Sequence, residues 1–123
     1  VDIVLDTHPY PGGTTTAEAL WMGVPTLTLS GNTLLARQGE GILRCVGLAD
    51  WVATSAQDYV TKAVEKASDL SSLAVLRANL RAQALSSPLF DSVRFARNLE
   101  DAFEGMAKAE KHRSQWLAAP ANR

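Results

Sequence analysis

Five consecutive residues of this sequence are the best suited to bind an anion: Gly12, Gly13, Thr14, Thr15 and Thr16. Glycine lets another group approach the backbone closely, and threonine places a hydroxyl beside the start of a helix. The first N–H groups of a helix have no partner within it and carry part of its positive dipole end. The run therefore predicts either a cradle for a phosphate or an ordinary turn that a threonine caps. It matches neither GxGxxG nor a Walker A loop.

The flanking segments predict the elements that position this run. Residues 1–5 are mainly apolar, as in a parallel strand that is covered on both faces, and two prolines end the strand. The helix after the threonines is expected to end at Gly23, before Pro25. Residues 26–30 form a second β-rich run. In such a strand–helix–strand unit, ligands bind beyond the carboxyl ends of the strands.

Polar residues near this edge have two interpretations each. His8 either faces a ligand or bonds only to backbone, and Arg37 either meets a phosphate or an acidic neighbour. Tyr10 is expected to pack rather than to react. Glu18 follows Thr15 by three positions, the spacing of a capping box, in which the glutamate bonds back to the cap residue.

Two segments carry a resemblance to a known family. The segment LDTHPYPGGTTTAEALWMGVPTLTL resembles the corresponding part of the O-linked N-acetylglucosamine transferases, which include SPINDLY-type proteins. The later segment SSPLFDSVRFARNLEDAF is similar to the end of the same catalytic region. The resemblance covers residues 1–109 and implies a two-lobed enzyme that uses UDP-N-acetylglucosamine, with the nucleotide held mainly by the second lobe.

The resemblance also implies roles for individual residues. Thr14 and Thr15 match the threonines that meet the diphosphate, and their neighbours Gly12, Gly13 and Thr16 are expected to belong to the same diphosphate site. Glu18 matches an acidic residue that meets the ribose. Animal members carry Asp at the position of Glu18 and His at that of Gly13. The implied reaction transfers N-acetylglucosamine to Ser or Thr of proteins without a metal or other cofactor. No residue here is assigned as catalytic.

The expected fold class is α/β, the C-terminal portion of a Rossmann-like nucleotide-binding lobe with a small parallel sheet between helices. Residues 1–109 form the partial UDP-sugar-binding domain, and residues 110–123 a charged, flexible tail with an isolated Trp116. The other strands are expected upstream, so the fragment alone is expected to be inactive. An exposed sheet edge predicts pairing with a second copy.

Composition limits the remaining classes of function. The 123 residues are 46% hydrophobic and 20% charged, which is typical of a soluble globular domain. A net charge of −1 argues against nucleic-acid or membrane-surface binding. We expect no signal peptide and no metal site. A cytoplasmic location is expected because the single cysteine, Cys45, fits a reducing compartment. Cys45 lies in an apolar helical run and is expected to be buried.

The rest of the chain predicts mainly helices. A helix over residues 37–46 contains Gly39 and Gly41, which we expect to be retained for close packing. Residues 48–54 predict an edge strand, and Ser55 and Asp91 are expected to cap later helices. Two alternatives to the transferase stay open: a non-catalytic nucleotide- or protein-binding module, and a related transferase that uses another nucleotide sugar.

Overall fold

The structure is a computed structural model that describes the backbone of residues 1–118 and the side chains of residues 1–110. The chain divides into two compact units, Val1–Phe90 and Asp91–Arg123. The first unit contains the sheet and the glycine–threonine run, and the described part of the second is a single helix.

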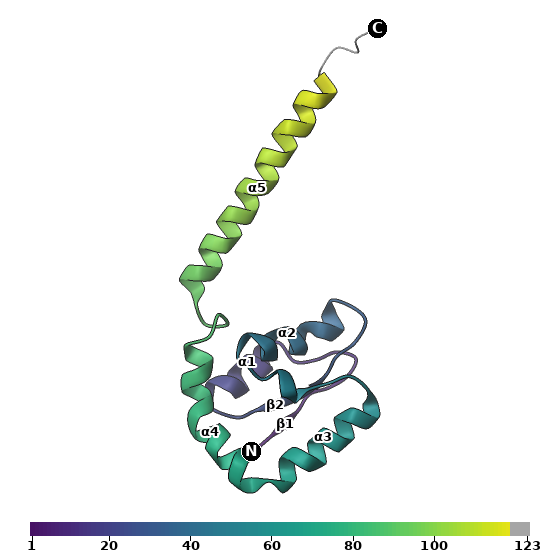
Figure 1. The fold of residues 1–123 in the computed structure, drawn as a ribbon, viewed down its shortest axis with the longest axis vertical. Coiled ribbons are helices and arrows are strands. Elements are labelled where there is room, and N and C mark those ends of the chain that lie inside the picture. The colour runs from purple at the N-terminus through teal and green to yellow at the C-terminus, as the bar shows by residue number, and fades with distance from the viewer. Residues whose placement is uncertain (119–123) are drawn as a thin grey trace. The chain divides into compact units, whose positions relative to one another are not determined.

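The first unit alternates strands and helices (Figure 1). In chain order, its elements are β1 (Val4–Leu5), α1 (Thr14–Trp21), β2 (Thr26–Leu29), the 3₁₀ turn η1 (Leu35–Arg37), α2 (Gln38–Cys45), the 3₁₀ turn η2 (Ala49–Trp51), β3 (Val52–Ala53), α3 (Ala56–Ser68) and α4 (Leu70–Leu85). The strands form one parallel sheet in the order β1-β2-β3. Val4 pairs with Thr26, and Thr28 pairs with Val52, so β2 is the central strand.

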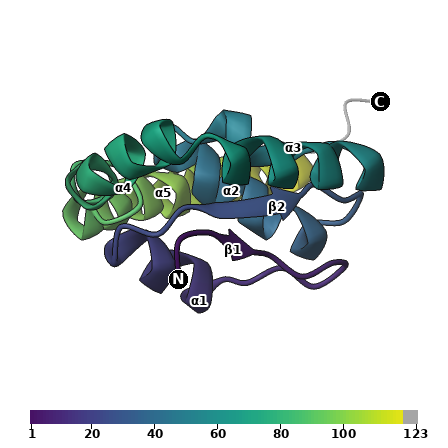
Figure 2. The same ribbon diagram turned by 90° about the horizontal axis from the view of Figure 1, so that it is seen from below.

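Helices cover the sheet and form the core with it. α1 and α2 pack against β2 and against each other, whereas α3 packs against β2 and β3. Figure 2 shows β2 between α1 and α3. The core is made of apolar side chains from all these layers, among them Leu20, Leu27, Leu43, Trp51, Leu73 and Leu80. The predicted α/β class, with a small parallel sheet between helices, is confirmed.

Local signals set most helix ends. The Ser55 hydroxyl accepts a hydrogen bond from the Asp58 N–H at 3.1 Å, which confirms the predicted cap of α3. Gly23 and Gly47 follow α1 and α2 with φ of 72° and 79°, values that glycine adopts without strain. Helix termini are therefore the part of the fold that follows most directly from the sequence.

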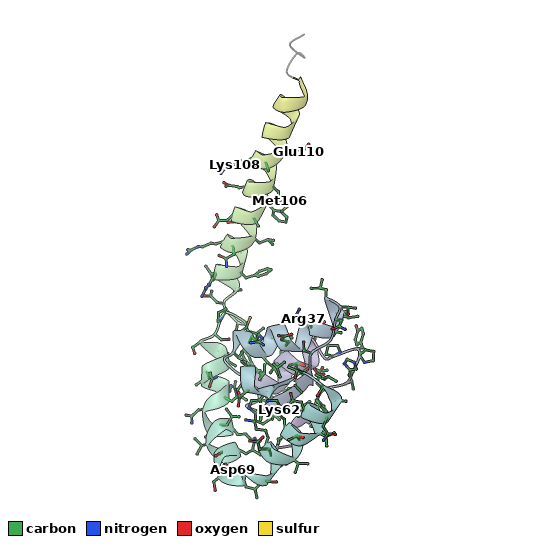
Figure 3. All side chains as sticks on the ribbon, turned by 45° about the vertical axis from the view of Figure 1, so that its right-hand side comes forward. Arg37, Lys62, Asp69, Met106, Lys108 and Glu110 are labelled. Carbon is green, nitrogen blue, oxygen red and sulfur yellow. The ribbon has the colours of Figure 1, made fainter. Side chains whose placement is uncertain are left out.

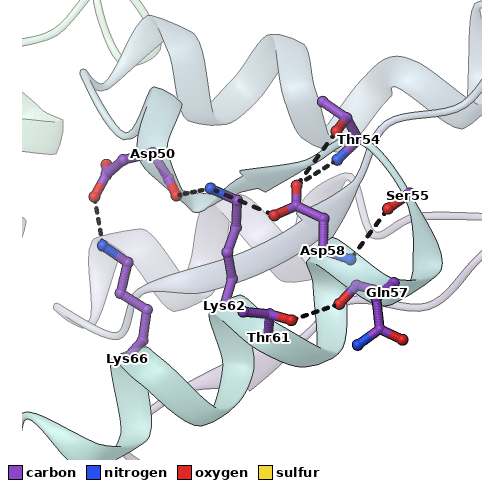
Figure 4. Close-up of polar contacts among 8 residues, drawn as sticks. All are labelled: Asp50, Thr54, Ser55, Gln57, Asp58, Thr61, Lys62 and Lys66. Carbon is purple, nitrogen blue, oxygen red and sulfur yellow. Dashed lines mark hydrogen bonds and ion pairs between the residues drawn. The ribbon is translucent and has the colours of Figure 1, made fainter.

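Polar contacts attach α3 to the turn before β3 (Figure 4). The Lys66 Nζ lies 2.6 Å from a carboxylate oxygen of Asp50, and the Lys62 Nζ donates to the Asp50 carbonyl at 3.3 Å. The Asp58 carboxylate accepts from the Thr54 N–H at 2.9 Å. Figure 3 shows Lys62 on α3, with Asp69 at the junction between α3 and α4. The Asp58 bond thus holds the start of α3 after β3, and the two lysines hold the later turns of the helix to η2.

Two sequence expectations about the middle of the chain are wrong, and a third is right except for its bounds. Cys45 is exposed, because the buried positions of α2 include Leu43 but not the residue two places later, which lies on another side of the helix. A Cβ on Gly41 would meet nothing within 4 Å, so close packing does not explain this glycine. The edge strand is only Val52–Ala53, because η2 occupies the residues before it.

The second unit contains α5 (Ser92–Ala118). The Asp91 carboxylate accepts from the Arg94 N–H at 2.9 Å, which confirms the predicted cap, and Lys108 pairs with Glu104 at 3.0 Å. The helix includes residues 110–118 of the predicted tail; the Trp116 side chain and residues 119–123 lie outside the described part, and the flexibility of the tail stays a prediction. Among the described residues, no helix has the length and apolarity to cross a bilayer.

Candidate functional site

Asp6 shapes the loop between β1 and α1. Its Oδ1 accepts from the N–H groups of Gly12 at 2.7 Å and Thr7 at 3.1 Å, and its Oδ2 accepts from the Thr28 hydroxyl at 2.7 Å. One carboxylate thus joins both ends of the loop to the central strand. Gly12 is held at the carboxyl edge of the sheet, directly before α1.

Two further hydrogen bonds stabilise this loop. The Thr7 hydroxyl donates to the Tyr10 carbonyl at 2.5 Å, and the Tyr59 hydroxyl of α3 donates to the Asp6 carbonyl at 2.8 Å. Burial, assisted by the negative charge of Asp6, raises the pKa of the Tyr59 phenol. The phenol therefore remains a protonated donor at neutral pH, and α3 helps to hold the loop in place.

The N-terminus of α1 carries no side-chain cap. Gly13 occupies the cap position, and no side chain accepts from the N–H groups of the first turn. The Thr16 side chain is buried, and its hydroxyl donates back to the Gly12 carbonyl at 3.0 Å. The expectation that a threonine caps this helix is therefore wrong. The capping-box interpretation of Glu18 is also wrong, because α1 begins at Thr14 and places Glu18 in its second turn.

An open hollow lies in front of this helix start. It brings together four of the predicted site residues and four others: Gly12, Gly13, Thr14, Thr15, Thr7, Tyr10, Pro11 and Gln38. The side chains of Thr14 and Thr15 are exposed, so their hydroxyls are accessible beside the helix N-terminus. Tyr10 is 68% exposed, which contradicts the expectation that it packs inside.

Other predicted site residues lie outside this hollow. His8 is exposed in the loop, and Thr16 faces the interior. Glu18 lies one turn further along α1, beside an apolar hollow that also contains Trp21, Met22 and Phe90. The structure therefore groups the glycines with the first two threonines and places Glu18 on the adjoining surface.

Arg37 has an acidic neighbour. Its Nε lies 3.1 Å from the Glu40 carboxylate, which also accepts from the Arg44 Nε at 2.9 Å and from the Ser30 hydroxyl at 2.5 Å. These bonds, that of Ser30 first, lower the pKa of Glu40 to about 2. Of the two partners that the sequence left open for Arg37, the structure contains the carboxylate, and Figure 3 shows Arg37 at the surface of the first unit.

Sequence reasoning missed two residues around the hollow, Asp6 and Gln38, whereas the close approach that it expected at Gly39 is confirmed. A polar residue that ends an apolar strand just before a glycine-rich loop is a signal that could have identified Asp6. Gly39 allows α2 to approach, because a Cβ there would lie 2.4 Å from the Thr28 Oγ1 and 2.7 Å from the Asp6 Oδ2. Gln38 carries no local signal, since its position depends on the path of α2.

The chemistry of the hollow suits a phosphate rather than a metal ion. Uncapped backbone N–H groups and threonine hydroxyls donate hydrogen bonds to an anion, and the helix dipole favours negative charge at this end. Among the residues with described side chains, no three His, Cys, Asp or Glu residues gather as a metal site would require. The site can bind and stabilise an anion, and it contains no evident nucleophile–base pair.

Comparisons with known proteins identify the family of this chain. The model of glycosyl transferase family 41 matches residues 1–99. A tomato protein named "Probable UDP-N-acetylglucosamine--peptide N-acetylglucosaminyltransferase SPINDLY" is 44% identical over 106 residues, which are 86% of this chain and 11% of that protein. An Arabidopsis thaliana protein named "Probable UDP-N-acetylglucosamine--peptide N-acetylglucosaminyltransferase SEC" is 36% identical over 103 residues, which are 83% of this chain and 10% of that protein.

A solved structure is also similar. The chain titled "Thermobaculum terrenum O-GlcNAc transferase mutant - K341M" superposes with a TM-score of 0.80 and 42% sequence identity, over 86% of this chain and 20% of that one. The present chain spans about a tenth of the length of the curated relatives that it matches. Since the family model covers most of the sequence, the chain belongs to glycosyl transferase family 41.

Proposed function

We propose that this chain is the diphosphate-binding part of an enzyme that transfers N-acetylglucosamine from UDP-N-acetylglucosamine to Ser or Thr of proteins. The observation that carries the proposal is the uncapped start of α1, which lies behind Gly12 and Gly13 and presents Thr14 and Thr15 to an open hollow. The names of the family relatives support the donor and the acceptor class.

The chemical contribution of this part is electrostatic. When the bond between the sugar and UDP breaks, negative charge develops on an oxygen of the departing diphosphate. Donors that already point at that oxygen stabilise the charge without having to reorganise. The backbone N–H groups and the hydroxyls of Thr14 and Thr15 supply such donors. No general base is assigned, because no residue here lies in a position that identifies it.

Several finer features belong to the same proposal. Glu18 binds the ribose hydroxyls from the second turn of α1, and His8 and Arg37 are further candidates for contact with the donor. The enzyme acts in the cytoplasm without a metal cofactor, and it binds neither nucleic acid nor a membrane. The edge of β1, which has no strand beyond it among the described residues, is a surface through which two copies of the chain can pair.

Titration of the ¹⁵N-labelled chain with UDP, with uridine as control, tests the proposal by amide NMR. We expect shifts concentrated between Gly12 and Glu18 with UDP and much weaker shifts with uridine. Competition among UDP, GDP and ADP tests the nucleotide, and added EDTA tests the absence of a metal. A folded chain that shows no shift at millimolar UDP would contradict the proposed site.

Threonine variants test the individual hydroxyls. Replacing Thr14 or Thr15 by valine keeps the shape of the side chain and removes one donor, so we expect UDP affinity to fall by about 3- to 10-fold for each. Thr61→Val is the matched control, because Thr61 is exposed on α3 and its hydroxyl donates only to the Gln57 carbonyl. Equal UDP affinity in all three variants would argue against direct contact by the threonines.

A further inference from the structure

Gln38 lies directly against Gly13, the cap residue before α1. A Cβ built on Gly13 would lie 2.2 Å from the Gln38 Nε2 and 3.2 Å from its Cδ, far inside normal contact distance. The amide group of Gln38 therefore occupies the space that any side chain at position 13 would need. Gly13 has φ −108° and ψ −80°. The atoms that its Cβ would meet lie at the far end of the flexible Gln38 side chain, so a larger residue at position 13 would displace the Gln38 amide.

The backbone of α2 holds Gln38 in this place. Gln38 is the first residue of α2, and Gly39 beside it is buried against Thr28 and Asp6, where even a Cβ would collide. Asp6 is the residue that also fixes the Gly12 N–H. The start of α2 and the start of α1 both lie against one carboxylate, which places the backbone of Gln38 beside the hollow while its side chain remains exposed.

The Gln38 amide is available for a ligand. It lines the same hollow as Thr14 and Thr15, and its exposed side chain makes no hydrogen bond within the described part of the chain. A primary amide offers two N–H donors and one carbonyl acceptor. Beside the start of α1, it offers the hollow a neutral donor from a second element.

We propose that Gln38 is a further ligand-binding residue of this site, whose side-chain amide donates a hydrogen bond to a diphosphate oxygen of the bound nucleotide. The proposal rests on the proposed function, since it takes the anion in the hollow to be the diphosphate. It adds a contact from α2 that neither the glycine–threonine run nor the family comparison supplies. The glycine at position 13 and the glutamine at position 38 act as a pair, in which the first makes room for the second.

Binding of UDP to Gln38 variants tests this role. We expect Gln38→Ala to weaken UDP affinity by about tenfold, the effect of one lost hydrogen bond to a charged group. Gln38→Glu should weaken it further, because a carboxylate replaces the donors and repels the diphosphate. Ala78→Glu, which adds the same charge on an exposed position of α4, should change the affinity less than twofold. Inorganic pyrophosphate should show the same order of affinities as UDP.

The pairing with Gly13 gives a second readout that a purely structural role would not produce. Gly13→Ala should displace the Gln38 amide, so Gln38→Ala should have little further effect on UDP affinity in the Gly13→Ala background. If the parent chain binds UDP and Gln38→Ala and Gln38→Glu bind it within twofold of the parent, the assignment of Gln38 is wrong while the proposed function stands. If the folded parent does not bind UDP, the proposed function fails and the assignment fails with it.

Discussion

Two helices begin at the carboxyl edge of the same sheet, and their first turns differ. At α3, the Ser55 hydroxyl accepts from the Asp58 N–H, and the Asp58 carboxylate accepts from the Thr54 N–H, so the first turn is closed by its own side chains. At α1, glycine occupies the cap position and no side chain bonds to the first turn. Closure by local side chains supports folding, whereas an open start keeps donors for another molecule.

The open start of α1 is held from outside the helix. Asp6 bonds to the Gly12 N–H and to the Thr28 hydroxyl, and Thr16 bonds back to the Gly12 carbonyl, so the loop is ordered without use of the N–H groups of the first turn. A binding site needs donors that are fixed but unbonded. The comparison indicates that α1 gains rigidity from Asp6 and β2, and that α3 gains it from its cap.

The largest predicted effect follows from removal of Asp6. Asp6→Ala leaves the Gly12 N–H and the Thr28 hydroxyl without their acceptor in a partly buried position, so we expect the free energy of unfolding to fall by about 2–4 kcal/mol. Urea unfolding followed by circular dichroism measures the change. Asp2→Ala is the control, because Asp2 is exposed and pairs only with Arg77. Equal stability of the two variants would show that the loop does not depend on Asp6.

The second prediction concerns the approach of α2 to this support. Gly39→Ala would place a Cβ 2.4 Å from the Thr28 Oγ1, so we expect a loss of about 1–3 kcal/mol in the free energy of unfolding. Gly41→Ala meets no atom within 4 Å and should be neutral or stabilise the helix by up to about 1 kcal/mol. Thermal unfolding of both variants tests the pair. A similar effect of the two substitutions would contradict the close contact at Gly39.

Local signals in the sequence predicted the closed helix start but not the support of the open one. Ser55 and Asp58 are three residues apart, and Asp91 and Arg94 likewise, so their bonds form within one turn and are visible as a pattern. The threonine run resembles the same kind of cap, which is why the sequence alone gave two interpretations of it. The glycine at the cap position and the inward turn of Thr16 exclude the cap, and the phosphate cradle stays a proposal.

The support of α1 depends on residues that are distant in sequence. Asp6 and Thr28 are 22 positions apart, and Tyr59 bonds to Asp6 across 53 positions. Their meeting depends on the parallel sheet and on the packing of α3 against it, and no spacing rule within one element encodes it. For the same reason, the sequence placed Cys45 inside: an apolar run shows that a helix is partly buried, but not which side faces the core.

The third prediction uses pH to test the polar cluster in which the Glu40 carboxylate accepts hydrogen bonds from Ser30, Arg37 and Arg44. The pKa of Glu40 is lowered from 4.5 to about 2 in the folded chain, so the unfolded chain binds the proton first as the pH falls. The ionised Glu40 carboxylate contributes to the free energy of unfolding above about pH 4.5, and this contribution is lost as the pH approaches 2. The shift corresponds to at most about 3 kcal/mol, and exposure of the two arginines reduces the expected loss to about 1–2 kcal/mol.

Glu40→Gln isolates this contribution from those of other carboxylates. Between pH 5 and pH 2.5, urea unfolding should show a larger loss of stability in the parent chain than in Glu40→Gln, because glutamine does not titrate. Parallel pH profiles for the two chains would show that Glu40 is not held ionised by Ser30, Arg44 and Arg37. The prediction extends the comparison, since the cluster, like the start of α3, satisfies its polar groups within the fold.

The smallest effect is the most direct test of the difference between the two helix starts. Ser55→Ala removes the cap of α3 and should lower the free energy of unfolding by about 1 kcal/mol, with no change in UDP affinity. Thr15→Ala removes a hydroxyl that caps nothing, so stability should stay within about 0.5 kcal/mol of the parent while UDP affinity falls. Urea unfolding and UDP titration of both variants give the free energy of unfolding and the UDP affinity of each. If Thr15→Ala costs as much stability as Ser55→Ala, the threonine closes its helix in solution, and the start of α1 is not held open for a ligand.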